Sequence, residues 1–538
     1  FNTEFVPAEN LGIKNAKWDS KDGYQVNRDC YNSYFYLVED DNTNHLDKFV
    51  LHGKEITQYL DGGSALHLNL DENEDTDTDG LFTVDKVACL GCCTIAPAVQ
   101  IDDTTFGHVE PAKVSEILDE FLNSDNTTTS GKANKVIHKN TIDGEIRIGL
   151  GSCCIASGSS DVKSELEKSL KANKTNVEVK QVGCVGICNQ VPLLEIHKNG
   201  ESPYYYTKIA ATEVNQIIRK HFRSKNTFTR LKTDISGFID NYIIKGVPIS
   251  TRKYSSESVD TPVAEFLDGQ INLATEYRGA IKPDDLDEYK KLGGLQALKK
   301  CLTSNKPSEI IESIKQSGLR GRGGGGFSSG IKWEIVKNTN SDQKYVICNG
   351  DEGDPGAFMD RSIMEGLSHL VLEGMIIGAY AIGANTGYIY VREEYPTAVE
   401  NLQLAIAQAK EANFLGENIL GSGFNLEIII KRGAGAFVCG ESSALMRSIE
   451  GKIGEPAEKY IHASEKGLWK KPTVLNNVET FANIPYIITN GAAEYKKMGT
   501  DKSPGTKIFS LVGKVVNTGL IEVEMGTTLR EIIYDIGE

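Results

Sequence analysis

The chain has 538 residues, of which 74 are acidic and 58 are basic, so its formal net charge is −16 at pH 7. This length exceeds what one hydrophobic core usually serves, so several domains are expected. The acidic balance argues against binding to nucleic acid, whose phosphates it would repel, and no apolar run reaches membrane-spanning length. Because residue 1 is Phe, the chain is interpreted as a fragment of a longer protein.

An internal repeat marks the N-terminal part of the chain. Residues 87–101, VACLGCCTIAPAVQI, and residues 182–196, VGCVGICNQVPLLEI, share one pattern of Cys, Gly and Pro. Such self-similarity predicts two copies of one domain, at residues 1–122 and 140–222. The polar residues 123–139 between them are interpreted as a linker, and residues 223–290, with weak periodicity, as a connecting arm.

Further along the chain, helical and strand patterns alternate. Apolar spacing predicts helices over residues 161–173, 292–302, 307–319, 369–384 and 398–413, and a strand over residues 387–395. The last segment, residues 507–537, is expected to form a hairpin followed by a helix. This alternation of strands and helices predicts an α/β multidomain fold.

A glycine-rich segment carries the strongest functional signal. Residues 318–333 read GLRGRGGGGFSSGIKW. A backbone without Cβ atoms can approach a phosphate closely, and the nearby Arg322 and Lys332 add positive charge. The segment therefore predicts a cradle for a phosphorylated, ring-bearing cofactor, the alternative being a flexible loop.

Three later segments place polar or small residues directly after apolar stretches. They read ICNGDEGDPG at residues 347–356, GAGAFVCGE at 433–441 and PTVLNNVET at 472–480. Strand ends in α/β folds present ligand groups in this way. All four segments in this order resemble the NADH-binding flavoprotein subunit of respiratory complex I and the same module of NAD-linked hydrogenases.

This resemblance implies a Rossmann-like FMN- and NADH-binding domain at residues 291–500 and the start of a ubiquitin-like domain at 501–538. A domain with a [4Fe–4S] cluster would follow beyond the end of the chain. The implied FMN-binding residues are Gly321, Arg322, Gly323, Gly324, Lys332, Asn349, Asp351, Glu352, Asn476 and Asn477. The implied NADH-binding residues are Phe327, Asp354, Phe437, Gly440, Glu441, Lys459 and His462.

The chain departs from the family pattern at several of these positions. Gly325 and Gly350 replace alanines in the cofactor segments. In the nucleotide pocket, Ile335 and His462 replace stacking rings, and Ser442 replaces an acid. These changes keep open an alternative in which the nucleotide pocket has lost its activity.

Both N-terminal copies resemble the thioredoxin-like [2Fe–2S] domain of the small electron-transfer subunit of complex I. A [2Fe–2S] cluster normally needs four thiolates. The second copy offers Cys153, Cys154, Cys184 and Cys188, with Gly149 where the family has its first cysteine. Adjacent cysteines in an extended segment would point to opposite sides.

The first copy offers only the neighbouring cysteines Cys89, Cys92 and Cys93, with no early pair. It is therefore expected to lack a cluster, and these thiols are interpreted as small core residues. Clustered cysteines elsewhere in the chain favour iron–sulfur chemistry in a reducing compartment over disulfides.

The resemblance implies an NADH:acceptor oxidoreductase module, in which hydride passes from NADH to FMN and single electrons pass to iron–sulfur clusters of a larger complex. The expected partners are NAD(H) and other subunits of that complex, without membrane insertion. The expected location is a soluble, reducing compartment: the cytoplasm or a mitochondrial or hydrogenosomal matrix. Two alternatives remain: an accessory subunit that keeps the fold without NADH oxidation, and a flavoprotein with another electron donor.

Overall fold

The computed structural model describes residues 143–198, 200–201, 203–222, 266–267, 270–458 and 462–538. It also gives the backbone of the short strands β1 (Ala16–Lys17), β2 (Glu39–Asp40), β3 (Val99–Ile101), β4 (Thr104–Phe106) and β9 (Arg252–Ser255). The cysteines of the first copy, the linker at 123–139 and Lys459 lie outside the described residues. The chain divides into two compact units, and the second contains residues 139–352 and 357–538.

The second N-terminal copy forms a mixed sheet in the order β6-β5-β7-β8-β9. Strand β5 (Gly144–Gly149) is parallel to β6 (Val177–Val182) and antiparallel to β7 (Leu194–Lys198), which pairs with β8 (Tyr204–Thr207). Apolar positions of α4 (Ser159–Asn173) and α5 (Val214–His221), among them Leu166 and Ile218, pack into one core with Ile146 and Ile196 of the sheet. The helix expected at residues 161–173 is confirmed.

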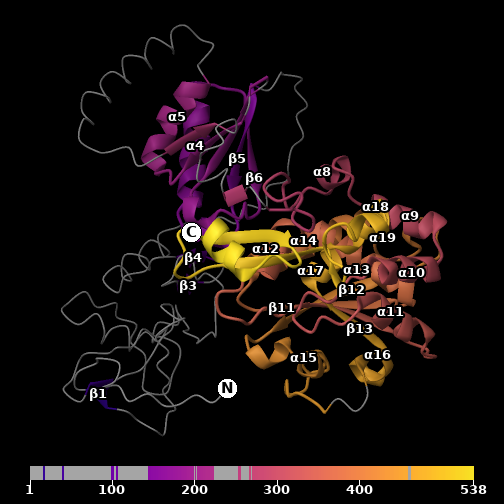
Figure 1. Ribbon diagram of the computed structural model, residues 1–538. Helices are drawn as coiled ribbons and strands as arrows, with labels where there is room; N and C mark the ends of the chain where they lie inside the picture. The colour runs from indigo at the N-terminus through magenta and orange to yellow at the C-terminus, as the bar shows by residue number, and fades with distance from the viewer. Residues whose placement is uncertain are drawn as a thin grey trace, which may run out of the picture. The chain divides into compact units, whose positions relative to one another are not determined.

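A parallel sheet in the order β12-β11-β10-β13 forms the centre of the C-terminal part. Its strands are β10 (Tyr345–Gly350), β11 (Thr386–Arg392), β12 (Glu427–Gly433) and β13 (Thr473–Asn477). If the four strands are numbered by their order in the chain, their order across the sheet is 3-2-1-4. The direction of winding therefore reverses between β10 and β13. Figure 1 shows this sheet among the helices that follow its strands.

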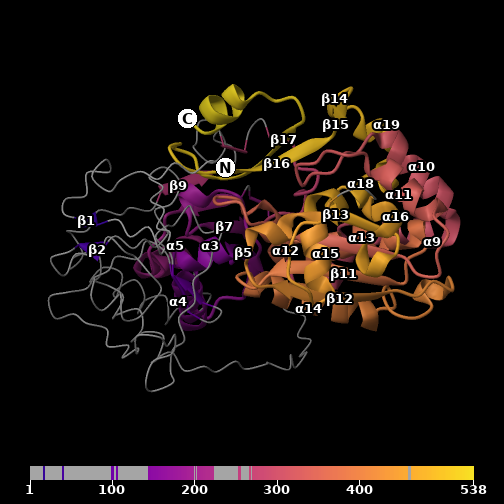
Figure 2. The ribbon, with the colours of Figure 1, turned by 90° about the horizontal axis from the view of Figure 1, so that it is seen from below.

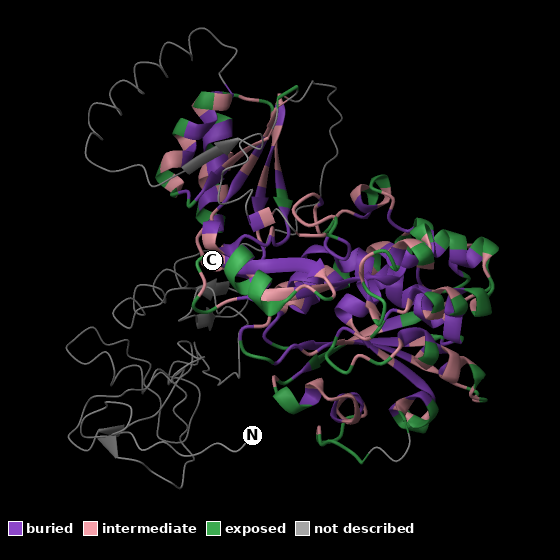
Figure 3. Ribbon diagram, in the orientation of Figure 1, coloured by how far each residue is buried: buried purple, intermediate pink, exposed green. Residues whose placement is uncertain are grey.

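Two cores cover the two faces of this sheet. Val346, Cys348 and Ile389 belong to the larger core, which contains much of the helix α13 (Ser368–Ile382), where every residue except Tyr380 is buried. The alternate residues Ile347 and Tyr388 pack instead with α15 (Ser442–Ile449) and η8 (Leu468–Lys470), as period-2 alternation requires. Figure 1 shows α15 on the opposite side of the sheet from α13, and Figure 3 shows the strands and α13 buried.

The remaining helices surround these cores. The helices expected at residues 292–302, 307–319 and 398–413 are confirmed as α9, α10 and α14. The bounds are α8 (Leu286–Lys291), α9 (Gln296–Ser304), α10 (Pro307–Ser317), α11 (Ser329–Asn338), α12 (Met359–Gly366), α14 (Pro396–Glu411), α16 (Ala463–Lys466), α17 (Val478–Ala482), α18 (Ile484–Asn490) and α19 (Ala492–Tyr495). Within the described residues no single helix is long and apolar enough to cross a membrane, although α12 and α13 pass that test as a pair bent by 97°.

The end of the chain forms the expected hairpin, from β16 (Thr506–Leu511) and β17 (Gly519–Glu524), followed by the π-helix η9 (Glu531–Ile536) (Figure 2). The buried carboxylate of Glu522 accepts hydrogen bonds from the backbone N–H groups of Leu273, Ala274 and Thr275, each at 3.0 Å. Residues 270–290, expected to belong to a connecting arm, are therefore bound into the C-terminal fold.

Candidate functional site

Polar residues from two strands meet where the winding of the parallel sheet reverses. In the sheet register Asn349, at the end of β10, lies beside Asn477, at the end of β13, and Cys348 lies beside Asn476. The carboxyl ends of the strands at such a reversal form the usual ligand crevice of open α/β sheets. The fold thus brings together two segments that sequence analysis assigned to one cofactor.

The glycine-rich loop lies against this crevice. Its ends are joined by a bridge between Arg320 and Ser328, and the Gly321 N–H donates to the Phe327 carbonyl over 2.8 Å. A Cβ atom placed on Gly323 would lie 3.1 Å from the Cβ of Asn477, so the loop passes close to the end of β13.

The backbone of the loop suits an anion. Gly324 has a φ of 96°, a conformation that glycine adopts without strain. The hydrogen bonds found among the described residues use none of the N–H groups of Gly323, Gly324 and Gly325, and all three residues are exposed. Free N–H groups of successive residues in a turn can bind a phosphate.

The two cations next to the loop differ in what they contact. Lys332, on α11, donates to the Leu475 carbonyl over 2.8 Å and lies 3.3 Å from Oδ1 of Asn476. Burial lowers the pKa of Lys332 to about 8, so its charge is poorly solvated in the absence of an anion. The Lys332 ammonium is therefore held beside Asn476 at the end of β13.

The side chain of Arg322 has different hydrogen-bond partners from that of Lys332. Its buried guanidinium donates to the Pro504 carbonyl over 2.7 Å and to the Tyr495 hydroxyl over 3.0 Å. Its backbone N–H donates to the Thr480 hydroxyl over 2.9 Å. The side chain therefore anchors the loop to the protein, whereas the sequence pattern had suggested a direct phosphate contact.

The acids after β10 are bonded within the protein. Asp351 accepts from Nη1 of the fully buried Arg392 over 2.9 Å, and Nη2 of Arg392 contacts Glu394 at 2.7 Å. Burial raises the pKa of Asp351 to about 6, although the charge of Arg392 acts in the opposite direction. Glu352 accepts hydrogen bonds from the first N–H groups of α12, those of Met359, Asp360 and Arg361.

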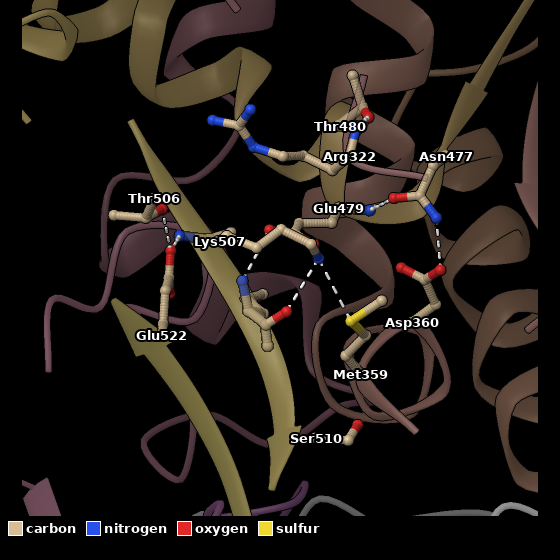
Figure 4. Close-up of polar contacts among 12 residues, drawn as sticks. Arg322, Met359, Asp360, Asn477, Glu479, Thr480, Thr506, Lys507, Ser510 and Glu522 are labelled. Atoms are coloured by element: carbon tan, nitrogen blue, oxygen red, sulfur yellow. Dashed lines mark hydrogen bonds and ion pairs between the residues drawn. The ribbon is translucent and has the colours of Figure 1, made fainter. Parts of the chain in front are cut away.

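A buried cluster of acids lies behind Asn477 and was not expected from the sequence (Figure 4). The Asn477 amide donates to Asp360, and Glu479 accepts from Lys507 and from the Ile508 N–H, the latter at 2.9 Å. Burial raises the pKa values of Asp360 and Glu479 to about 7 each. Because Lys507 is far from Asp360 in the sequence, no local pattern indicated this grouping.

The residues expected to bind a nucleotide lie on several segments of the chain. Asn349 donates to the Gly440 carbonyl over 3.0 Å, which ties β10 to η7 (Phe437–Gly440). The carboxylate of Glu441 accepts from the N–H groups of Ser443 and Ala444, so it caps α15. Phe327 and Phe437 are 53% and 55% exposed, and Asp354 and His462 are also exposed.

The four cysteines of the second copy lie in one buried region. Cys153 and Cys154 belong to the short helix α3 (Ser152–Ala156), which corrects the extended geometry expected for them. Cys184 and Cys188 lie in the second loop, and a hydrogen bond between these two thiols lowers the pKa of Cys184. Burial, and then the charges of Cys184 and Cys153, raise the pKa of Cys154.

Four buried cysteines match in number and type the protein ligands of a [2Fe–2S] cluster. Among the described His, Cys, Asp and Glu side chains, no group of three could hold one metal ion. A [2Fe–2S] cluster instead distributes its four protein ligands as two per iron. The Gly186 N–H also donates to the Cys184 sulfur over 3.3 Å, and N–H donors to sulfur are typical around such clusters.

The relatives of this chain include subunits of a hydrogenase and of an NADH-quinone oxidoreductase. The chain is 55% identical over 268 residues to "NADP-reducing hydrogenase subunit HndC" of Solidesulfovibrio fructosivorans, covering 50% of this chain and 54% of the relative. It is 53% identical over 269 residues to an NADH-quinone oxidoreductase subunit of Aquifex aeolicus (strain VF5), covering 50% and 63%. It thus spans little more than half the length of these relatives.

Among solved structures, the NAD+-reducing [NiFe]-hydrogenase in the H2-reduced state aligns with 74% of this chain and 61% of that chain, with 25% sequence identity and a TM-score of 0.44. Family models match two parts of the sequence. Residues 55–122 and 138–221 match the thioredoxin-like [2Fe–2S] ferredoxin family, which confirms the predicted repeat, and residues 314–486 match the Nuo51 FMN-binding domain. The chain therefore contains two segments similar to the thioredoxin-like [2Fe–2S] ferredoxin family and one segment similar to the Nuo51 FMN-binding domain.

Proposed function

We propose that this chain is the NADH-oxidising flavoprotein module of an electron-transfer complex. The observation that carries the proposal is the meeting of the glycine-rich loop, Asn349 and Asn477 at the reversal point of the parallel sheet. Bound FMN would supply the redox chemistry, by accepting hydride from NADH and releasing single electrons to iron–sulfur clusters. The protein residues supply binding, orientation and charge.

The proposed FMN site separates into a phosphate end and a polar end. The exposed N–H groups of Gly323 and Gly324 and the ammonium of Lys332 would hold the phosphate. Arg322 would act by fixing the loop through Tyr495 and Pro504. The polar end comprises Asn349, Asp351, Glu352, Asn476 and Asn477.

The proposed nucleotide site lies around η7 and the start of α15. The exposed rings of Phe327 and Phe437 offer apolar faces for the bases of NADH. Gly440, Glu441, Asp354, Lys459 and His462 complete the proposed site. Cys153, Cys154, Cys184 and Cys188 are the proposed ligands of a [2Fe–2S] cluster.

The names of the relatives support a place in a larger assembly. Both relatives are named as subunits, one of a hydrogenase and one of an NADH-quinone oxidoreductase. We therefore propose other subunits of such a complex as partners, and a soluble location in a reducing compartment. The hairpin of β16 and β17 with η9 is proposed as the start of a ubiquitin-like domain.

The test is anaerobic spectroscopy of the purified full chain. Acid release and chromatography should recover FMN, and adding NADH should bleach the flavin absorption. NADPH is titrated in parallel, because one relative is named NADP-reducing. Recovery of FAD or of no flavin contradicts the proposal, whereas FMN that neither nucleotide bleaches favours an accessory subunit that retains the fold.

A further inference from the structure

Residues of α12 contact both the proposed flavin site and the region of the four buried cysteines. At the start of the helix Glu352 caps the backbone, and Asp360 is bonded to Asn477 in the crevice. At its end, a Cβ placed on Gly183, next to Cys184, would lie only 2.5 Å from the Cα of Gly366. Figures 1 and 2 show α12 between the strands of the thioredoxin-like domain and the parallel sheet.

One side chain of α12 reaches across this junction to a cysteine. Nη2 of Arg361 donates to the Cys153 sulfur over 3.0 Å. The guanidinium is 2% exposed and packs over the rings of Phe358 and Tyr395, at 5.8 and 5.5 Å from their centroids. A cation so enclosed has one orientation, and arginine remains charged at every physiological pH.

A carboxylate of the same helix lies beside this cation. Oε1 of Glu365 is 3.6 Å from Nε of Arg361, and the carboxylate accepts from both the N–H and the hydroxyl of Ser152, directly before Cys153. Arg361 and Glu365 therefore bring one positive and one negative charge to the cysteine region. Both charges are buried, where electrostatic effects are strongest.

We propose that Arg361, although it belongs to the flavin domain, is a positioning residue of the cysteine centre. It holds Cys153 by its sulfur and, with Glu365, sets the reduction potential of a [2Fe–2S] cluster bound by the four cysteines. One-electron reduction adds one negative charge to such a centre without forming or breaking a bond. A neighbouring cation favours that reduction and a neighbouring anion opposes it. This inference rests on the proposed function only for the presence of the cluster.

The test uses the full chain, loaded anaerobically with iron and sulfide, and an EPR-monitored potential titration with dithionite as reductant. Arg361→Gln should shift the midpoint potential to lower values, because the buried cation is lost. Glu365→Gln should shift it to higher values, and Arg361→Lys should keep it near that of the wild type. The control is Lys180→Gln, because Lys180 is a buried cation of the thioredoxin-like domain that pairs with Glu288, and its loss should leave the potential unchanged.

Opposite shifts of the midpoint potential in Arg361→Gln and Glu365→Gln would distinguish an electrostatic role from a general loosening of the junction. Shifts in the same direction for Arg361→Gln and Glu365→Gln, or no shift in either, would overturn the proposal. So would a wild-type chain that takes up no iron, or equal iron loss in Lys180→Gln and Arg361→Gln. Iron lost from Arg361→Gln but retained in Arg361→Lys supports the positioning role. Flavin content and NADH bleaching are recorded separately, so opposite shifts without bleaching would support this inference while rejecting the proposed function.

Discussion

The ammonium of Lys332 is the clearest single-residue determinant of the proposed phosphate site. Because burial lowers its pKa to about 8, the empty site loses this charge as the pH rises above that value. A bound phosphate favours the charged form, so binding above about pH 8 requires proton uptake. We expect the affinity for FMN to fall between pH 7 and pH 9.5, as measured by quenching of flavin fluorescence.

Lys332→Met should weaken FMN binding at pH 7 by about 10- to 100-fold, the size expected for one charge-assisted hydrogen bond. It should also remove most of the pH dependence. Lys337→Met, on the same helix, is the matched control and should bind like the wild type. Equal pH dependence in wild type and Lys332→Met would show that another group titrates.

Asp360 provides a second prediction, because its buried carboxyl affects stability. Burial raises its pKa to about 7 from an ordinary value of 3.8, so between about pH 4 and pH 7 the unfolded chain releases a proton that the folded chain keeps. The free energy of unfolding therefore falls as the pH rises through this range. Asp360→Asn should melt at a higher temperature than the wild type, with an advantage that grows from pH 4 to pH 7.

The variant keeps an oxygen that can accept from Asn477, so the fold should persist. Glu479, whose pKa is also raised to about 7 by burial, remains and retains part of the pH dependence. Asp501→Asn, at an exposed position, is the control for loss of an acid. A pH-independent difference in melting temperature would contradict the assignment.

At the scale of the element, the backbone conformation at Gly324 of the glycine-rich loop matters more than the free space above it. A Cβ on Gly324 or Gly325 would meet no atom within 4 Å, but only Gly324 has a positive φ. Alanine at position 324 would destabilise this backbone conformation by about 1 kcal/mol or more. If the loop relaxed to relieve that strain, its N–H groups would no longer point at a bound phosphate. Gly324→Ala should therefore weaken FMN binding about tenfold.

Gly325→Ala is the matched control, because it adds the same methyl group where the backbone does not require glycine. It should bind FMN like the wild type in the same titration. Equal weakening by both substitutions would mean that free space above the loop, and not its conformation, determines binding.

Sequence periodicity was sufficient to predict the helices and strands, but it was not sufficient to predict the contacts between them. The helix at 398–413 was predictable because it presents an apolar face at the helical period, and the strand at 387–395 because it begins with a continuous apolar run that is buried on both faces. The glycine-rich loop was predictable as an exposed turn because glycine acts on the backbone locally, and its role as an anion cradle stays a prediction. The role of Arg322 was not, because its acceptors on Tyr495 and Pro504 lie far along the chain.

Sequence patterns were likewise insufficient to predict the surroundings of the cysteines. An extended segment seemed the natural setting for Cys153 and Cys154, but the turn after β5 starts a helix at Ser152. The contact of Cys153 with Arg361 depends on the packing of one domain against another. No pattern in either segment encodes that contact.

For the second compact unit as a whole, two glycines approach each other closely where the thioredoxin-like domain packs against α12. The Cα of Gly366 would be 2.5 Å from a Cβ on Gly183, so a side chain at position 183 would force the backbones apart. Overpacking of this kind typically costs about 1–3 kcal/mol. Gly183→Val should lower the melting temperature of the thioredoxin-like domain and separate its calorimetric transition from that of the flavin domain.

Flavin content should stay at the wild-type level, because the crevice lies at the other end of α12. Ser160→Ala, at an exposed site of the same domain, is the control and should leave a single transition. One unchanged cooperative transition in Gly183→Val would show that the junction does not couple the two domains.

The bonding of Glu522 to Leu273, Ala274 and Thr275 has a consequence for how this junction persists. It fastens the chain to the C-terminal hairpin shortly before α8, so this part of the chain stays in place even when the contacts between the thioredoxin-like domain and α12 open. Reforming those contacts is then an intramolecular event, governed by an effective concentration and not by the bulk concentration of the protein. The junction can therefore open and close without its two sides separating, which two separate proteins of equal affinity could do only at high concentration.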